Sequence, residues 1–92
     1  YTEGRDIQEI RSTWRENYTS DTFRAIFPRA AHAFTWDDHE VSNNWDPETI
    51  DPDRMAAATD AFFEHTPTRR DPANPTRLWR SFLFGQTAEI FF

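Results

Sequence analysis

The spacing of apolar residues in the first third of the chain predicts two helices. From Asp6 onward, apolar side chains recur at helical spacing over residues 7–18, and the aspartate occupies the position of a helix cap. A polar stretch at residues 19–21 interrupts this pattern with side chains that prefer helix ends. Apolar positions within residues 23–27 predict a second, shorter helix ending near Pro28, because proline lacks the backbone donor that a continuing helix needs.

A different pattern follows at residues 31–36. This run, AHAFTW, is short and largely apolar, and its threonine and aromatic residues favour extended structure. It therefore predicts a buried strand of a mixed sheet, with a helix as the open alternative. A strand ending at Trp36 would place the following polar loop at its carboxyl end, where open α/β sheets bind ligands.

Cap and turn signals predict a third helix in the middle of the chain. Asp51 suits the cap of a helix whose first position is Pro52. Thr66 and Pro67 predict its end, because the residue before a proline avoids helical geometry. The residues expected on its apolar side are Met55, Ala58, Phe62 and Phe63.

The last part of the chain predicts a β-hairpin. Residues 71–75, DPANP, form a connector rich in turn-forming residues. After it, residues 77–84 and 87–92 flank Gly85 and Gln86, which indicates two strands joined by a tight turn. Helices and strands together place the chain in the α/β (α+β) class.

The amount of aromatic surface is large for so short a chain. Ninety-two residues make one domain at most, yet the sequence holds nine Phe and four Trp. We interpret this as a piece of a larger core, truncated at both ends. An intact small domain whose last strand is tied into its own sheet is the alternative.

Composition and charge narrow the classes of function. The formal net charge is −6 and there is no basic stripe, which argues against a nucleic-acid-binding surface. There is no cysteine, so disulfides and thiolate metal sites are excluded. No apolar run approaches the roughly 18 residues of a membrane span. The oligomeric state stays open.

The most unusual stretch is residues 35–47, TWDDHEVSNNWDP. It concentrates four carboxylates, one imidazole and two carboxamides, with no basic residue among them. Carboxylate and amide oxygens suit hard cations, and an imidazole can act as a further ligand or a proton donor. The spacing fits neither an EF-hand nor a zinc-protease motif. Composition alone leaves a metal or phosphate site and a solvated acidic loop both open.

Within that stretch, WDDHEVSNNW resembles the WDDHE-x-x-N-N-W signature of the PhoD-like phosphatases (alkaline phosphatase D), a branch of the calcineurin-like metallophosphoesterases. The flanking segments agree in order. IRSTWRENY precedes the signature, and AFFEHTPTRRDPANPTRLWRSFLFG follows it and is similar to the family's EYMP-x-R and LYR-x-F-x-FG segments. The resemblance covers essentially the whole chain.

The resemblance implies a four-layer αββα sandwich with a bimetallic site at the strand ends, of which residues 1–92 form part of one catalytic domain. The implied reaction is hydrolysis of phosphate mono- and diesters with two metal ions, Ca and Fe, or Mn or Mg instead. The implied location is secreted, periplasmic or cell-wall associated. The family's upstream GD box and its downstream Asp and His ligands are not among these residues, so the fragment alone is expected to be inactive.

Carried over by the resemblance, WDDHE takes the place of the superfamily's GNH[DE] box. Asp38 then stands at the position of a metal-ligating Asn, and His39 at that of the phosphate-facing catalytic His. Asn44, with Asn43 as the alternative, would offer an amide oxygen to the metal or an N–H to the phosphate. The side chains expected to orient this site or to contact substrate are Asp37, Glu40, Asn43 and Arg69.

Other polar residues have simpler interpretations. Arg69 and Arg70 could contact a substrate phosphate, or they could be solvated or ion-paired with Asp71. We expect His32 to be a packing residue and His65 to complement the dipole of its helix. The competing interpretation of the whole chain is a noncatalytic module, either an acidic Ca-binding domain or a degenerate metallophosphoesterase.

Overall fold

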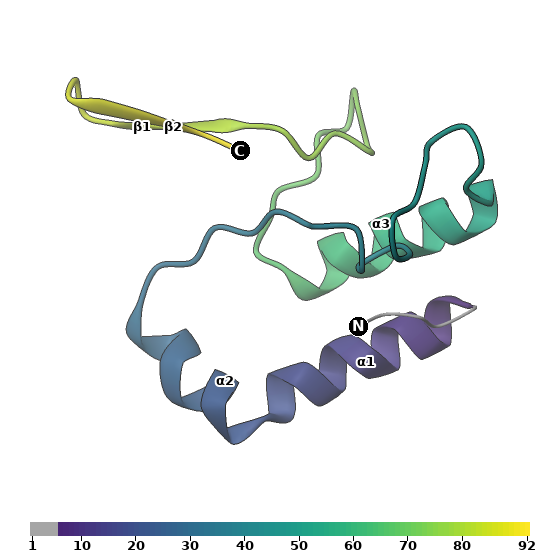
Figure 1. The fold of residues 1–92 in the computed structure, drawn as a ribbon. Helices are drawn as coiled ribbons and strands as arrows, with labels where there is room; N and C mark the ends of the chain where they lie inside the picture. The colour runs from purple at the N-terminus through teal and green to yellow at the C-terminus, as the bar shows by residue number, and fades with distance from the viewer. Residues whose placement is uncertain (1–5) are drawn as a thin grey trace.

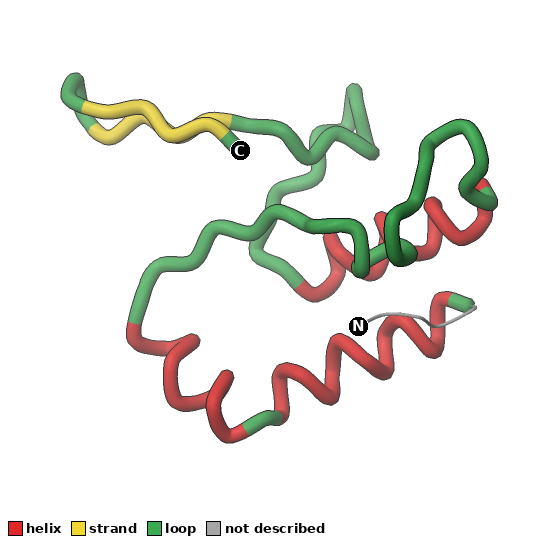
Figure 2. Tube along the Cα trace, viewed as in Figure 1, coloured by secondary structure: helices red, strands yellow, loops and turns green. Residues whose placement is uncertain are grey.

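The computed structural model describes residues 6–92 as a mixed α/β arrangement of helices and one hairpin (Figures 1 and 2). This confirms the α/β class in its general form. In chain order the elements are helix α1 (Ile7–Thr19), helix α2 (Asp21–Ile26), the 3₁₀ helix η1 (Phe27–Arg29), helix α3 (Pro52–His65), strand β1 (Ser81–Phe84) and strand β2 (Ala88–Phe91).

Side-chain caps fix the helix starts where the sequence predicts them. The Asp6 carboxylate accepts the N–H groups of Gln8 and Glu9 at 2.7 and 3.0 Å, so α1 begins at the next residue. Ser20 caps α2 in the same way. The Asp51 carboxylate accepts the N–H of Asp53 at 3.1 Å and starts α3. The three predicted helices are therefore confirmed.

The core lies where α1 and α3 pack side by side (Figure 1). Ile10 of α1 and Ala61 of α3 are both fully buried, and Phe62 is 1 % exposed. Trp14 meets the edge of the Phe62 ring at 6.2 Å between centroids. Val41, from the loop before α3, completes this core with 0 % exposure. The acidic loop is thus tied to the helix pair through the buried Val41, and its Trp45 packs, partly buried, against the same core.

The prediction of a strand at residues 31–36 is wrong. Burial alternates along this segment as it does in an extended chain. His32, Phe34 and Trp36 are half-buried, and the residues between them are exposed. Within residues 6–92, however, the one sheet has the order β1-β2, and this segment pairs with neither strand. The apolar pattern sets the extended conformation, but a strand also needs a neighbour to receive its backbone hydrogen bonds.

The predicted hairpin is confirmed, but its first strand begins at Ser81 and not at residue 77. β1 and β2 pair antiparallel, with Ser81 opposite Phe91 and Phe84 opposite Ala88. The turn begins at Gly85 with φ +61°, a conformation that glycine adopts without strain. Every residue of both strands is exposed, and the hairpin stands apart from the helices (Figure 1). Among the described residues, no helix is long and apolar enough to cross a membrane.

Candidate functional site

The acidic loop, defined here as residues 37–46, connects the extended segment to the turn before α3. Its fold is organised around Asp38. The Asp38 carbonyl accepts the N–H groups of Val41 and Ser42 at 3.0 and 2.8 Å, and its carboxylate Oδ2 accepts the N–H of Asn44 at 2.6 Å. That last hydrogen bond is the main cause of a lowered pKa at Asp38, so the carboxylate is ionised over a wider pH range.

His39 lies beside this carboxylate at the partly open side of the loop. Its Nε2 is 3.6 Å from Asp38 Oδ1, and the two side chains are 31 % and 27 % exposed. A protonated imidazole would form an ion pair at this distance. The loop therefore places a titratable ring and a carboxylate together where a ligand could approach both.

Two further predicted residues take part in the same turn. Glu40 folds back so that its Oε2 accepts the N–H of Asp37 at 2.8 Å. Asn44 adopts φ +49°, in the left-handed region that asparagine tolerates better than most residues. Asn43 and Asn44 are both exposed. The structure thus brings five of the predicted site residues together, through hydrogen bonds from Asp37 to Glu40 and from Asn44 to Asp38 and through the 3.6 Å approach of His39 to Asp38, with Asn43 next to Asn44 in the chain.

The fit of this loop to a metal can be judged from its donors. Asp38 keeps Oδ1 on the side facing His39 while Oδ2 holds the loop, and a carboxylate has room for both interactions. Asn44 uses its backbone N–H for the loop, which leaves its amide oxygen for a ligand. Asp38 Oδ1 and the Asn44 amide oxygen are thus the two oxygens of the loop that these hydrogen bonds leave for a ligand. Within residues 6–92, no group of three or more His, Asp or Glu side chains is arranged to hold a metal ion.

Arg54 is a residue at this site that the sequence analysis missed. It lies in the first turn of α3, and its Nε donates to the carbonyl of Val41 at 2.6 Å. No local sequence signal marks it, because the two residues meet only through the packing of the loop on the helix. Trp36 and Trp45, which bracket the loop, meet edge to face at 6.4 Å between ring centroids.

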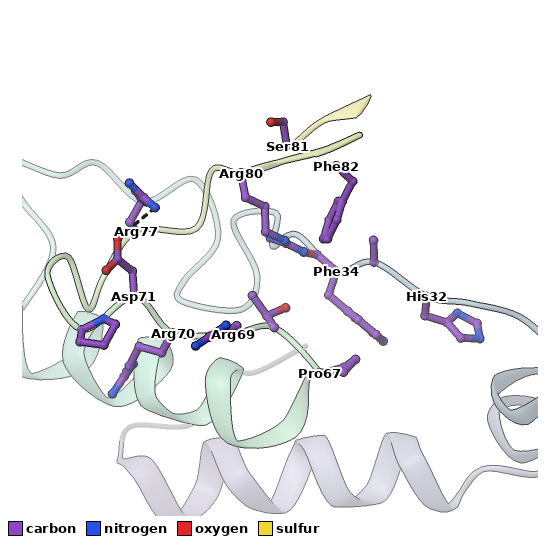
Figure 3. Close-up of a pocket in the computed structure, with 13 residues that line it drawn as sticks. His32, Phe34, Pro67, Arg69, Arg70, Asp71, Arg77, Arg80, Ser81 and Phe82 are labelled. Carbon is purple, nitrogen blue, oxygen red and sulfur yellow. Dashed lines mark hydrogen bonds and ion pairs between the residues drawn. The ribbon is translucent and has the colours of Figure 1, made fainter. Parts of the chain in front are cut away.

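Arg69 lies in a different place, on the wall of a cavity of about 520 Å³ (Figure 3). The cavity is bounded by the extended segment, by the connector after α3 and by the start of β1. Its lining includes four arginines and one aspartate, a concentration of positive charge in an acidic chain. The four arginines are Arg69, Arg70, Arg77 and Arg80.

Three of these guanidinium groups are already engaged. Arg70 pairs with Asp60 at 2.6 Å and lies over the Phe63 ring, while Arg77 pairs with Asp71 at 2.9 Å. Arg80 donates to backbone carbonyls of the extended segment and of its own strand entry. The suggested pairing of residues 69–70 with Asp71 is therefore wrong for Arg70. Arg69 forms no ion pair with any carboxylate of residues 6–92.

The two histidines outside the loop have packing roles. His32 stacks on Phe27 at 4.6 Å between ring centroids, with Nε2 3.0 Å from the Phe27 carbonyl, so the prediction of a packing residue is confirmed. His65 lies in the last turn of α3 with Nδ1 2.8 Å from the Ala61 carbonyl. It also receives the Tyr18 hydroxyl hydrogen bond on its own carbonyl.

A comparison with known families decides the classification. The model of the PhoD-like phosphatases matches residues 2–92. The chain belongs to the PhoD-like phosphatase family. It is 38 % identical over 96 residues to alkaline phosphatase D of Bacillus subtilis (strain 168). That match covers 92 % of this chain and 16 % of the relative, so this PhoD-like chain spans about a sixth of the relative's length. No solved structure matches the chain.

Proposed function

We propose that this chain is part of the catalytic domain of a metal-dependent phosphatase or phosphodiesterase. The observation that carries the proposal is the acidic loop, in which Asp38 holds the backbone of Asn44 while His39 lies 3.6 Å from its second oxygen. Family membership supports the reaction class. The proposed substrates are phosphate mono- or diesters.

In the proposed mechanism, His39 faces the phosphoryl group. There it stabilises developing negative charge or gives a proton to the leaving oxygen. Asp38 Oδ1 and the amide oxygen of Asn44 would serve as metal ligands. The hydrogen bond from the Asp37 N–H to the Glu40 carboxylate helps to hold the loop in this conformation. When bound, two metal ions, proposed as Ca and Fe with Mn or Mg as alternatives, supply charge neutralisation and an activated water.

Asn43 and Arg69 are proposed to assist substrate binding. Asn43 is an exposed residue of the acidic loop and can donate its amide N–H to a phosphate oxygen. Arg69 lines the positively charged cavity, and a guanidinium binds phosphate through two parallel hydrogen bonds. In these roles both residues would contact the substrate outside the reacting atoms.

The proposed architecture of the whole protein is the four-layer αββα sandwich, with residues 1–92 inside a single catalytic domain and the remaining metal ligands elsewhere in the protein. The exposed apolar side chains of the hairpin support this arrangement, since Leu83 and Phe91 are 74 % and 75 % exposed. The proposed location of that protein, taken from the family, is secreted, periplasmic or cell-wall associated.

A noncatalytic role is the second candidate. This candidate applies if the rest of the protein adds no metal ligands to those of the acidic loop. In that case the loop would bind Ca weakly, or the protein would be a degenerate metallophosphoesterase.

Turnover of a chromogenic phosphate ester by the full-length protein separates the two candidates. Activity should disappear on chelation and return when Ca is added together with Fe or Mn. Turnover that resists chelation would contradict the proposed metal dependence. A folded, metal-loaded protein without turnover would favour the noncatalytic role.

A further inference from the structure

Val41 is held at two points. Its side chain is completely buried in the core with Ile10 and Ala58, and its carbonyl accepts the Arg54 Nε–H at 2.6 Å. The first interaction fixes the depth of the residue against α1 and α3. The second fixes the rotation of its peptide group, because a hydrogen bond to a carbonyl is directional.

The position of Val41 determines the geometry of the turn that carries His39. The Val41 N–H donates to the Asp38 carbonyl at 3.0 Å, which closes the turn over residues 38–41. His39 is inside that turn, and the Asp38 carboxylate at its start also holds the Asn44 N–H. Any rotation of Val41 would therefore move the imidazole and both proposed metal donors.

Arg54 makes this contact from a rigid element. It lies in the first turn of α3, a helix anchored by its Asp51 cap and by the burial of Ala58 and Phe62. The side chain is partly buried. Although the neighbouring loop is acidic, Arg54 forms no ion pair with any carboxylate of residues 6–92, and its Nε–H donates to a backbone carbonyl instead. The Arg54 guanidinium thus fixes the position of the loop backbone at Val41. The carboxylates of Asp38 and Glu40 remain bonded to N–H groups of the loop.

We propose that Arg54 is a positioning residue of the acidic loop, which acts through the Val41 carbonyl to hold His39, Asp38 and Asn44 in their working geometry. The proposal rests on the proposed phosphatase function. Groups that orient the residues of a metal site are commonly worth about 10- to 100-fold in activity, and a displacement of about 1 Å is enough to cause such a loss.

The test uses the full-length protein with the substitutions Arg54→Met and Arg54→Lys. Arg54→Met keeps most of the stem but removes the donor, and kcat should fall about 10- to 100-fold with KM changed by less than about threefold. Arg54→Lys should recover part of kcat, because an ammonium group can donate to the same carbonyl.

Arg11→Met is the matched control. It removes an arginine that also contacts α3, through Glu64 at 2.6 and 2.5 Å, but does not touch the acidic loop. It should lower thermal stability and leave kcat unchanged. An unchanged kcat in Arg54→Met, or an equal loss of kcat in Arg11→Met, would overturn the proposal.

Amide hydrogen exchange gives a second readout that does not need turnover. In Arg54→Met, the amides of Val41, Ser42 and Asn44 should exchange at least about tenfold faster while those of α1 keep their protection. Unchanged protection in the loop would also overturn the proposal. If the wild-type protein shows no turnover but the loop amides lose protection as expected, the phosphatase function fails and the positioning of the loop by Arg54 stands.

Discussion

The backbone N–H of Asn44 donates to the Asp38 carboxylate at 2.6 Å, so one carboxylate oxygen closes the acidic loop. The other oxygen lies 3.6 Å from the His39 ring. One side chain thus links the fold of the loop to its chemistry. Three of the four carboxylates in this short segment, those of Asp38, Glu40 and Asp46, accept backbone N–H groups, which stabilises their charged form.

Asn44→Gly should separate the backbone role of residue 44 from its side-chain role. Glycine adopts the observed φ of +49° without strain, so the N–H to Asp38 is kept and the melting temperature should change by only about 2 °C or less. If the amide oxygen holds a metal, kcat and metal content should both fall. Full activity of a folded Asn44→Gly protein would remove Asn44 from the set of proposed ligands.

Phe62→Ala should be strongly destabilising. The ring is 1 % exposed and packs against Trp14 and Trp36, and removing such a ring costs about 3–5 kcal/mol of unfolding free energy. Denaturant unfolding of the full-length protein measures the change. Glu16→Ala, at an exposed position of α1, is the control and should have little effect. A loss below about 1 kcal/mol for Phe62→Ala would contradict the assigned core.

The ion pair between Arg11 and Glu64 predicts a small dependence of stability on acid. The hydrogen bond from Arg11 is the main cause of a lowered Glu64 pKa, so the folded-state value lies below the ordinary 4.5. The stabilisation is therefore complete above pH 4.5 and is lost as the pH falls through the lower folded-state value. The effect is modest, because the Glu64 side chain is 42 % exposed and screened by salt.

Melting temperatures of wild type and Glu64→Gln between pH 3 and pH 7 test this sign. The melting temperature of the wild type should exceed that of Glu64→Gln by a constant amount at the upper end of the pH range. This difference should shrink at the lower end. An advantage that grows as the pH falls would mean that Glu64 is not stabilised as a carboxylate by Arg11.

The 92 residues on their own should hydrolyse no phosphate ester. Catalysis by two metals needs the ions held about 3.5–4 Å apart, and the acidic loop offers too few donors for that. The exposed hairpin should also bind a hydrophobic dye or aggregate, since Leu83, Phe84 and Phe91 face solvent. A soluble monomer with a sharp thermal transition and metal-stimulated turnover would contradict both expectations.

The features predicted correctly from sequence are those encoded locally. Helices α1 and α3 begin directly after Asp6 and Asp51 because each carboxylate accepts N–H groups from the first turn, and the hairpin forms around a glycine with positive φ. Local sequence could not show whether residues 31–36 form a strand. Their apolar pattern is correct for extended structure, but strand formation depends on a pairing partner that is remote in sequence.

The same distinction holds for the acidic loop. Asp38, His39 and Asn44 lie within seven consecutive residues, so their residue types and order are enough to propose a site. The contact from Arg54 to Val41 joins residues that are 13 positions apart and depends on how the loop packs on α3. Sequence pattern alone has no signal for such a contact.

The central claim is that the acidic loop carries the chemistry of a phosphate ester hydrolase, and the turnover of His39→Ala in the full-length protein tests it most directly. We expect kcat to fall by about 10²–10⁴-fold with the fold retained, because His39 lies in a partly exposed loop outside the core. His65→Ala, at the end of α3, should leave kcat nearly unchanged. Equal kcat values for the two folded variants would contradict the assignment of His39.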